Sequence, residues 1–269
     1  MKKPLEFYGI QVSKPTDWAK VLRFELCPFL NKKCVKQRKS NPQQTIGACT
    51  IGFKDDLPLI ICPHRFLQHN KIFVDSVPLL AKGEKYFVLP EISMPGGNID
   101  YFVISEVKGD IIDYLGLEIQ GLDTTGSGGI WAAREDLKKG EFGDNYSYGI
   151  NWKMSAKTIL IQMHHKGQAF ESLGKKLVLV TQKSFFDYMT REFRTRHLHE
   201  AVGEDAIQFQ IYDCIQLEGC FELVLTTRKS TDVIGMEEML KLGREPTISE
   251  EEVVRRIKAK MGSAIKLQL

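Results

Sequence analysis

The clearest pattern of apolar and polar positions in the chain predicts a β-hairpin. Residues Asp100 to Val107 are rich in β-branched and aromatic side chains, and Ile111 to Gln120 repeat this composition after a polar turn. A turn centred on Gly109 places Asp100 directly opposite Glu118 on the returning strand. The hairpin therefore predicts two facing carboxylates.

Apolar positions after the hairpin predict alternating helices and strands. A long helix is expected from Asn151 to Leu173, where apolar residues recur and Gly174 stands at the C-cap. Further elements are expected as a buried strand at 177–181, a helix at 183–189, strands at 206–217 and 221–227, a short helix at 235–242, and a last helix from a capping box at 249–252 to about residue 261. We expect a mixed α/β (α+β) fold.

Composition agrees with a globular protein. The chain has 269 residues, of which 43% are hydrophobic and 26% charged, so neither disorder nor a fibrous fold is indicated. No signal-peptide stretch and no run of about 18 apolar residues is present. We therefore expect a cytoplasmic protein with no membrane segment. The net charge of +3 permits a nucleic-acid partner without requiring one.

Four cysteines lie in the first quarter of the chain: Cys27, Cys34, Cys49 and Cys62. The segment from Leu26 to Phe66 has few periodic apolar residues, so we expect it to need a metal to order it. Clustered cysteines in the cytosol are more often metal ligands than disulfides, although four unrelated buried thiols are the alternative. Four thiolates suit a structural zinc or iron ion, or an iron–sulfur cluster. We predict a metal-binding region at 1–70 and a second domain at 71–269.

The facing carboxylates of Asp100 and Glu118 are the candidate catalytic groups. Opposed Cβ atoms in an antiparallel pair lie about 4.5–5.5 Å apart, which lets both carboxylates bind one cation. Gln120 shares the face of Glu118 and is expected to position a water or a phosphate. Mg²⁺ relieves the repulsion between the carboxylates and activates water near a phosphate. On spacing alone, the alternative is a solvated pair on an exposed sheet face.

Several short segments together resemble the NotI-like family of type II restriction endonucleases. These segments are Cys27-Pro-Phe, Cys34, Gly47-Ala-Cys49, Ile61-Cys-Pro-His-Arg-Phe66, Pro90-Glu91, Asn98-Ile-Asp100 and Leu117-Glu-Ile-Gln120. The resemblance runs from about residue 26 to residue 126. A four-cysteine cluster combined with a Glu-x-Gln strand is more specific than either part alone.

The resemblance implies a PD-(D/E)XK nuclease core with an N-terminal four-cysteine metal-binding subdomain. It implies Asp100, Glu118 and Gln120 as the active site, with Glu91 as a further carboxylate on the Mg²⁺. It also implies iron held by the four cysteines, with zinc chemically possible. Gln120 departs from the wider superfamily, in which this motif position is usually Lys, and this departure leaves open what orients the nucleophile.

An endonuclease also needs side chains that contact phosphates. Candidates are the basic residues beside the cysteines and the polar residues of the glycine-rich loop after the active strand: Lys32, Lys33, Lys36, Arg38, Lys39, Thr124, Thr125 and Ser127. Cutting both strands of a palindrome is most simply achieved by a twofold dimer. We therefore expect a homodimer that binds double-stranded DNA.

The sequence thus predicts a type II restriction endonuclease that makes Mg²⁺-dependent, sequence-specific double-strand cuts in DNA. One alternative is a CRISPR-associated or repair-exonuclease-like nuclease with an iron–sulfur cluster beside a similar core. Another is a non-catalytic DNA-binding module held together by zinc, in which the hairpin carboxylates are incidental. No motif marks the recognition sequence.

Overall fold

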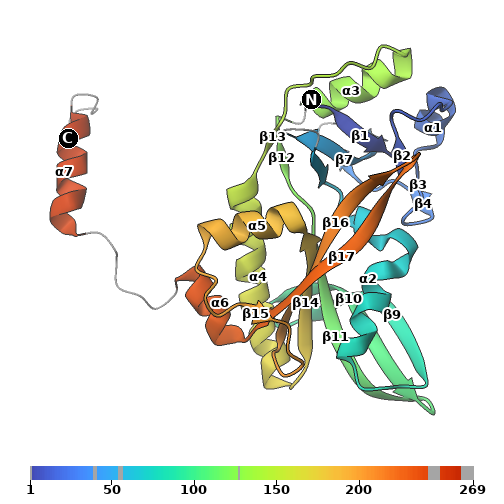
Figure 1. Ribbon diagram of the computed structural model, residues 1–269. Coiled ribbons are helices and arrows are strands. Elements are labelled where there is room, and N and C mark those ends of the chain that lie inside the picture. Colours follow the sequence, from blue (N-terminus) through green and yellow to red (C-terminus); the bar gives the residue numbers. More distant parts are fainter. Residues whose placement is uncertain (1, 39–40, 54–56, 127, 242–248, 262–269) are drawn as a thin grey trace.

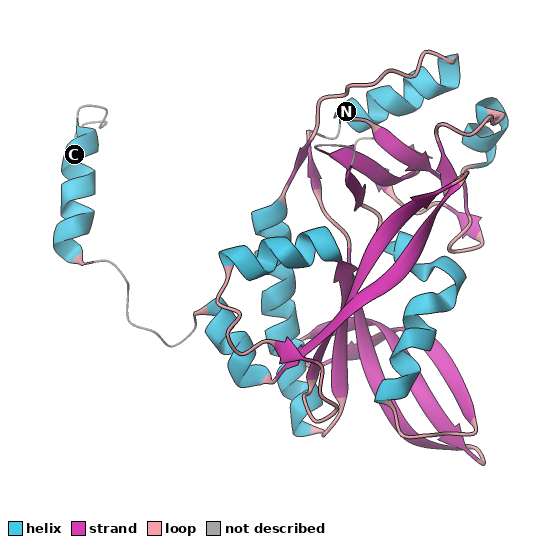
Figure 2. Cartoon of the chain, in the orientation of Figure 1, coloured by secondary structure: helices cyan, strands magenta, loops and turns pink. Residues whose placement is uncertain are grey.

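The computed structural model describes residues 2–38, 41–53, 57–126, 128–241 and 249–261 (Figures 1 and 2). The first part of the chain contains β1 (Pro4–Phe7), β2 (Ile10–Gln11), α1 (Trp18–Phe24), β3 (Leu26–Cys27), β4 (Lys32–Lys33), β5 (Gln37–Arg38), β6 (Asn41–Thr45), β7 (Ala48–Phe53), β8 (Leu57–Ile60), η1 (Pro63–Asn70), α2 (Lys71–Ser76) and η2 (Val77–Leu79). The rest contains β9 (Lys85–Met94), β10 (Gly97–Val107), β11 (Asp110–Gln120), β12 (Thr124–Thr125), α3 (Gly128–Lys139), β13 (Gly149–Ile150), α4 (Trp152–Ser172), β14 (Lys176–Gln182), α5 (Lys183–Glu192), β15 (His199–Glu200), β16 (Ile207–Leu217), β17 (Cys220–Thr231), α6 (Val233–Leu240) and α7 (Glu250–Lys260).

A seven-stranded mixed sheet lies at the centre of the molecule, in the order β15-β17-β16-β14-β11-β10-β9. Strands β11, β14 and β16 are parallel, whereas β9–β10–β11 and β16–β17 are antiparallel. Helices α4, α5 and α6 cover one face of the sheet, and η1 and α2 lie against the other (Figure 1). The predicted mixed α/β fold is confirmed.

Alternating side chains of the central strands divide between two apolar cores. Phe102 and Ile104 of β10 belong to the core beneath α4, together with Phe170 of that helix. Val103 of the same strand and Leu117 of β11 belong to the core beneath η1 and α2. This alternation is the period of two that a strand buried on both faces requires.

The predicted hairpin is present as β10 and β11, and the predicted long helix is present as α4. The expected helix start at Ser249 is also present, because the Ser249 side chain accepts a hydrogen bond from the Glu252 backbone N–H at 3.3 Å, which is one of the two bonds of a capping box. Helix α3 was not predicted, since its sequence follows directly on a glycine-rich loop. Among the described helices, none has the length and apolar content needed to span a membrane.

The cysteine-bearing segment contains more regular structure than its composition suggested. Its strands β7 and β8 join β1 and β2 in a four-stranded sheet, in the order β2-β1-β7-β8. Strand β7 is almost entirely buried, with Ile51 at 0% exposure. Ile51 belongs to the same apolar core as Phe102 and Phe170, so apolar packing holds part of this segment.

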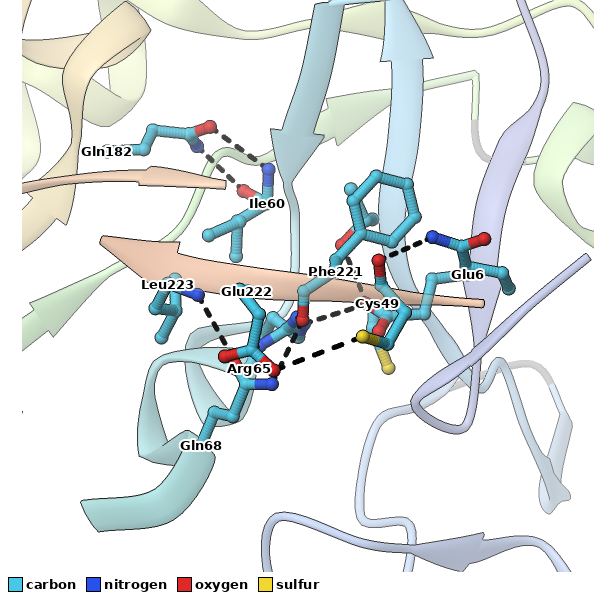
Figure 3. Close-up of polar contacts among 12 residues, drawn as sticks. Glu6, Cys49, Ile60, Arg65, Gln68, Gln182, Phe221, Glu222 and Leu223 are labelled. Atoms are coloured by element: carbon cyan, nitrogen blue, oxygen red, sulfur yellow. Dashed lines mark hydrogen bonds and ion pairs between the residues drawn. The ribbon is translucent and has the colours of Figure 1, made fainter. Parts of the chain in front are cut away.

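A buried ion pair fixes this first sheet to the central one (Figure 3). The guanidinium of Arg65 donates to Glu6 Oε2 at 2.9 Å, to Gln68 Oε1 at 2.8 Å and to the Phe221 carbonyl at 2.6 Å. Arg65 is 0% exposed and Glu6 is 1% exposed. Because the three acceptors come from β1, η1 and β17, this one side chain joins three segments that are distant in sequence.

Side-chain amides make two further connections between the sheets. Gln182, at the end of β14, accepts from the Ile60 N–H at 3.0 Å and donates to the Ile60 carbonyl at 2.8 Å (Figure 3). Gln11 of β2 donates to the Leu217 and Cys220 carbonyls at 3.3 and 2.7 Å. These bonds satisfy backbone groups that would otherwise be costly to bury.

Replacement of Arg65 by Met is expected to lower the free energy of unfolding by about 3–5 kcal/mol, because Glu6 would remain buried without its counter-charge. Urea unfolding followed by circular dichroism measures this loss. The matched control is Lys183→Ala, which breaks the half-exposed pair with Asp187 at 2.6 Å and should cost less than about 1 kcal/mol. Equal losses in the two variants would contradict the role assigned to Arg65.

Candidate active site

Asp100 and Glu118 are neighbours on strands β10 and β11. Regular pairing of the strands includes Tyr101 opposite Leu117, and the two acids are the next residues along each strand. Asp100 Oδ2 accepts a hydrogen bond from the backbone N–H of Ile119 at 2.9 Å. The hairpin therefore brings the two carboxylates to one place, as the sequence predicted.

Burial distinguishes this pair from a solvated pair on an open sheet. Glu118 is only 3% exposed, and Asp100 is half-buried. Burial is the main cause that raises the pKa of Glu118 to about 7, and the negative charge of Asp100 raises it further. Burial also raises the pKa of Asp100. The two groups are thus held in a setting that disfavours two uncompensated negative charges.

Glu91 lies beside Asp100 on the other neighbouring strand. The register of β9 and β10 places Ile92 opposite Ile99 and Pro90 opposite Tyr101, so Glu91 is next to Asp100 between these pairs. Its charge is one of the causes that raise the pKa of Asp100. Glu91 is exposed and has a φ of 48°, which is uncommon for a residue other than glycine.

A lysine that the sequence reasoning missed lies against the two acids. Lys166 Nζ donates to Glu118 Oε1 at 2.8 Å and to the carbonyl of Asn98 at 2.7 Å. Its positive charge opposes the rise in the pKa of both Asp100 and Glu118. Lys166 is 5% exposed, so its ammonium is nearly as buried as the carboxylate it contacts.

Helix α4 carries this lysine on its buried stripe. Ile159, Met163, Lys166 and Phe170 recur at helical spacing, and all four are buried. By contrast, Met154 and Ile161, which are apolar residues of the same helix, are exposed. A charged residue within an apolar stripe was therefore the available signal for Lys166.

Gln120 lies at the end of β11, where a cavity of about 360 Å³ separates it from the cysteine-bearing segment. Cys62, His64 and Asp123 also line this cavity. The amide of Gln120 donates to the carbonyl of Gly121. A larger cavity, of about 750 Å³, lies at α5 and is lined by none of the predicted catalytic residues.

The four cysteines of the N-terminal segment are all buried. Burial raises the pKa values of Cys27, Cys49 and Cys62, and the charges of neighbouring cysteines, Cys34 among them, raise these values further. The backbone carbonyl of Cys49 accepts from the N–H of Cys62 at 3.3 Å. The four sulfur atoms therefore lie close enough to influence one another's charge. If they ionised to thiolates, a nearby positive charge would be needed to offset their repulsion.

Neither set of residues forms a ready-made metal site. Within the part of the chain that the structure describes, no three His, Cys, Asp or Glu side chains are grouped closely enough to hold an ion. The chemistry of both sets nonetheless suits metals, since one or two carboxylates commonly serve Mg²⁺ and four thiolates serve zinc or iron.

Comparison with known proteins decides the family. Residues 16–216, which are most of the chain, match the family described as Restriction endonuclease NotI. The chain belongs to the NotI restriction endonuclease family. No curated protein matches the chain.

The NotI family is a family of nucleases. The match therefore confirms the resemblance that the sequence motifs indicated. The match covers the four cysteines, the facing carboxylates and the lysine of α4. These features consequently lie within the segment that defines the family, whereas α6 and α7 lie outside it.

The structure places the predicted DNA-contacting residues of this NotI-family chain in different surroundings. Lys32 is exposed on β4, Lys33 pairs with the buried Glu25 at 3.2 Å, and Lys36 donates to the carbonyl of Ile61. Thr124 and Thr125 form β12, which pairs with β13. Arg38 belongs to β5, but its side chain, like Lys39 and Ser127, lies outside the described residues.

Proposed function

We propose that the protein is a type II restriction endonuclease that makes Mg²⁺-dependent, sequence-specific double-strand cuts in DNA. The observation that carries this proposal is the pair of carboxylates formed by the half-buried Asp100 and the buried Glu118, at adjacent positions of β10 and β11. Membership of the NotI family supports a nuclease reaction at this pair. Burial and mutual repulsion disfavour the charged form of these carboxylates, and a bound divalent cation would offset both effects.

Asp100 and Glu118 would hold Mg²⁺, with Glu91 as a third carboxylate from β9. A bound Mg²⁺ supplies Lewis-acid chemistry, because it lowers the pKa of a bound water and neutralises charge on a phosphate. The chain supplies the positioning. Ile119 N–H fixes the Asp100 carboxylate, and Gln120, at the strand end beside the cavity, hydrogen-bonds water or phosphate.

We further propose a PD-(D/E)XK core in the central sheet. The β9–β10–β11 strands supply the acids, the parallel strand β14 continues the sheet, and α4 covers it. This arrangement gives the motif acids a rigid support, since both sides of β11 are paired. In this proposal residues 71–269 form the nuclease domain, and residues 1–70 form the four-cysteine region that packs against it.

The four cysteines, in this proposal, hold one structural iron or zinc ion. Four protein ligands leave no open coordination position, so the ion orders the segment and takes no part in hydrolysis. The burial of these thiols, whose thiolates would repel one another without a cation, supports this role. The cavity between Cys62 and Gln120 makes the metal-bearing segment one wall of the space beside the active strand.

DNA would contact the exposed Lys32 and the β12 threonines, and a homodimer would supply one active site to each strand. Lys33 and Lys36 have protein partners of their own, so Lys32 is the strongest of these three lysines for a phosphate contact. A cytoplasmic location is consistent with reduced cysteines that bind a metal.

Replacement of Glu118 by Ala is expected to lower the cleavage rate at least about 10³-fold, because metal-assisted catalysis supplies several kcal/mol. Unmodified bacterial genomic DNA is incubated with protein and Mg²⁺, and sequencing of the fragment ends maps the cut sites. The matched control is Asp110→Ala, which removes an exposed acid from the other end of β11 and should leave cleavage unchanged.

DNA binding by the Glu118→Ala protein should be retained, as measured by fluorescence anisotropy with a duplex that carries the mapped site. Cutting at unrelated positions, or only from DNA ends, would instead favour an exonuclease-like enzyme. Undiminished cutting by Glu118→Ala would contradict the assigned active site.

Purified protein is expected to contain about one equivalent of iron or zinc per chain, since four thiolates bind one ion. Elemental analysis measures this content, and Cys49→Ser should lose the metal and unfold at a lower temperature. Cys214→Ser is the control, because this half-buried thiol lies on β16 and is not one of the four proposed ligands. Broad visible absorbance with inorganic sulfide would instead indicate an iron–sulfur cluster.

A further inference from the structure

The active strand ends in an uncharged Gln120, yet a cation does reach the paired acids from another element. Lys166 of α4 extends its ammonium to Glu118 Oε1 at 2.8 Å. We propose that Lys166 is a catalytic residue of the nuclease and that its ammonium binds a non-bridging oxygen of the scissile phosphate. This inference rests on the proposed function and assigns the positive charge that the strand itself does not supply.

The hydrogen-bond geometry of Lys166 leaves room for this contact. An ammonium has three N–H donors. Among the described residues, Glu118 Oε1 and the Asn98 carbonyl accept two of them, at 2.8 and 2.7 Å. These two bonds fix the nitrogen within the site, and the third donor remains for a phosphate oxygen.

The burial of Lys166 argues against an ordinary structural role. Lysine is almost never fully buried unless it is paired, and a buried ion pair is often no more stabilising than apolar residues of similar volume. Ile159, Met163 and Phe170 show that this stripe of α4 otherwise packs with apolar side chains. Apolar packing of the helix therefore does not account for a lysine at this position, and the reason for its charge lies in the acid that it contacts.

The charges around the lysine do not balance. Asp100 and Glu118 together bring two negative charges to one ammonium, and Glu91 adds a third beside Asp100. One lysine therefore leaves an excess of negative charge, which a divalent cation offsets. With the cation bound, Lys166 contributes positive charge toward an incoming phosphate.

The turn between β9 and β10 is shaped around this lysine. A Cβ atom at Gly97 would lie 3.4 Å from Lys166 Cε, and one at Gly96 would lie 3.2 Å from the backbone of His165 and Lys166. Both glycines also have positive φ values, 91° at Gly96 and 124° at Gly97. The absence of side chains at the turn lets it approach α4 and present the Asn98 carbonyl to the ammonium.

In the proposed reaction, a water oxygen forms a bond to phosphorus while the bond from phosphorus to one ester oxygen breaks. The water loses a proton to solvent and the leaving oxygen gains one. Lys166 keeps its proton throughout and donates a hydrogen bond to a non-bridging oxygen, on which negative charge increases in the transition state.

The chain offers a matched control for this proposal. Lys175 pairs with Asp113 Oδ1 at 2.7 Å, so it also joins a lysine to an acid of strand β11. Asp113 lies toward the turn end of β11, away from Glu118. Lys175→Met consequently removes a similar ion pair without touching the site.

The test compares wild type with Lys166→Met, Lys166→Arg and Lys175→Met at saturating Mg²⁺. Single-turnover cleavage of a duplex carrying the mapped site should fall about 10²–10³-fold in Lys166→Met, as when one transition-state donor is removed. Lys166→Arg should keep part of the rate, because it keeps the charge. Lys175→Met should cleave within about threefold of wild type, as expected away from the reacting atoms.

A second measurement does not depend on cleavage. Affinity for the same duplex is measured by fluorescence anisotropy with Ca²⁺ in place of Mg²⁺, and Lys166→Met should bind about tenfold more weakly, a loss of about 1.4 kcal/mol. Thermal unfolding of each variant reports structural damage. If Lys166→Met does not fold, Lys166→Gln replaces it in both assays.

Three results would overturn the inference. The first is cleavage by Lys166→Met within threefold of wild type at every Mg²⁺ concentration, and the second is a loss of rate that appears only below saturating Mg²⁺, since Lys166 would then act only through Glu118. The third is unchanged DNA affinity together with a lower unfolding temperature, which marks a structural ion pair. Wild-type protein that cuts no DNA would instead refute the proposed function itself.

Discussion

The pairing register of β10 and β11 is the constraint on which the site depends, because it decides that Asp100 and Glu118 meet. Lys108 and Gly109 both have positive φ values, 52° and 93°, so the strands are joined by the tight two-residue turn that suits their twist. Next to the turn, Val107 pairs with Asp110, and a bulge after Ser105 then shifts the register by one residue. Without that bulge, the side chains beyond it would exchange faces.

Two buried ion pairs, Arg65–Glu6 and Lys166–Glu118, differ in how their charges are balanced. Arg65 donates to protein acceptors, and Glu6 accepts from Arg65 and from the Thr50 hydroxyl, so their charges are satisfied within the fold. Lys166 and Glu118 lie beside Asp100 and Glu91, where negative charge exceeds positive. The first pair fits a structural connection between sheets. The pair of Lys166 and Glu118 has an unbalanced charge, and groups in such a setting are more often found at functional sites than in the structural core.

The sequence predicted the elements whose pattern is local, and it missed those that depend on the assembled fold. The hairpin, α4 and the strands β14, β16 and β17 follow from periodicity and turns. The predicted facing of Asp100 and Glu118 was right although the turn was placed slightly wrongly, because the bulge supplies the residue that the turn omits. The register of the cysteine-bearing strands and the approach of Lys166 depend on contacts distant in sequence. Periodicity therefore describes Lys166 only as a charge on an apolar stripe.

The contacts of Arg65 also determine when the N-terminal sheet can complete its native contacts during synthesis of the chain. Its guanidinium reaches acceptors at Glu6, near the beginning of the chain, and at the Phe221 carbonyl, in the last strand of the central sheet. During translation, the N-terminal sheet emerges from the ribosome long before residue 221 exists. The buried charge can obtain its full set of partners only when β17 has been synthesised, so the first part of the chain to be made is among the last to reach its native environment.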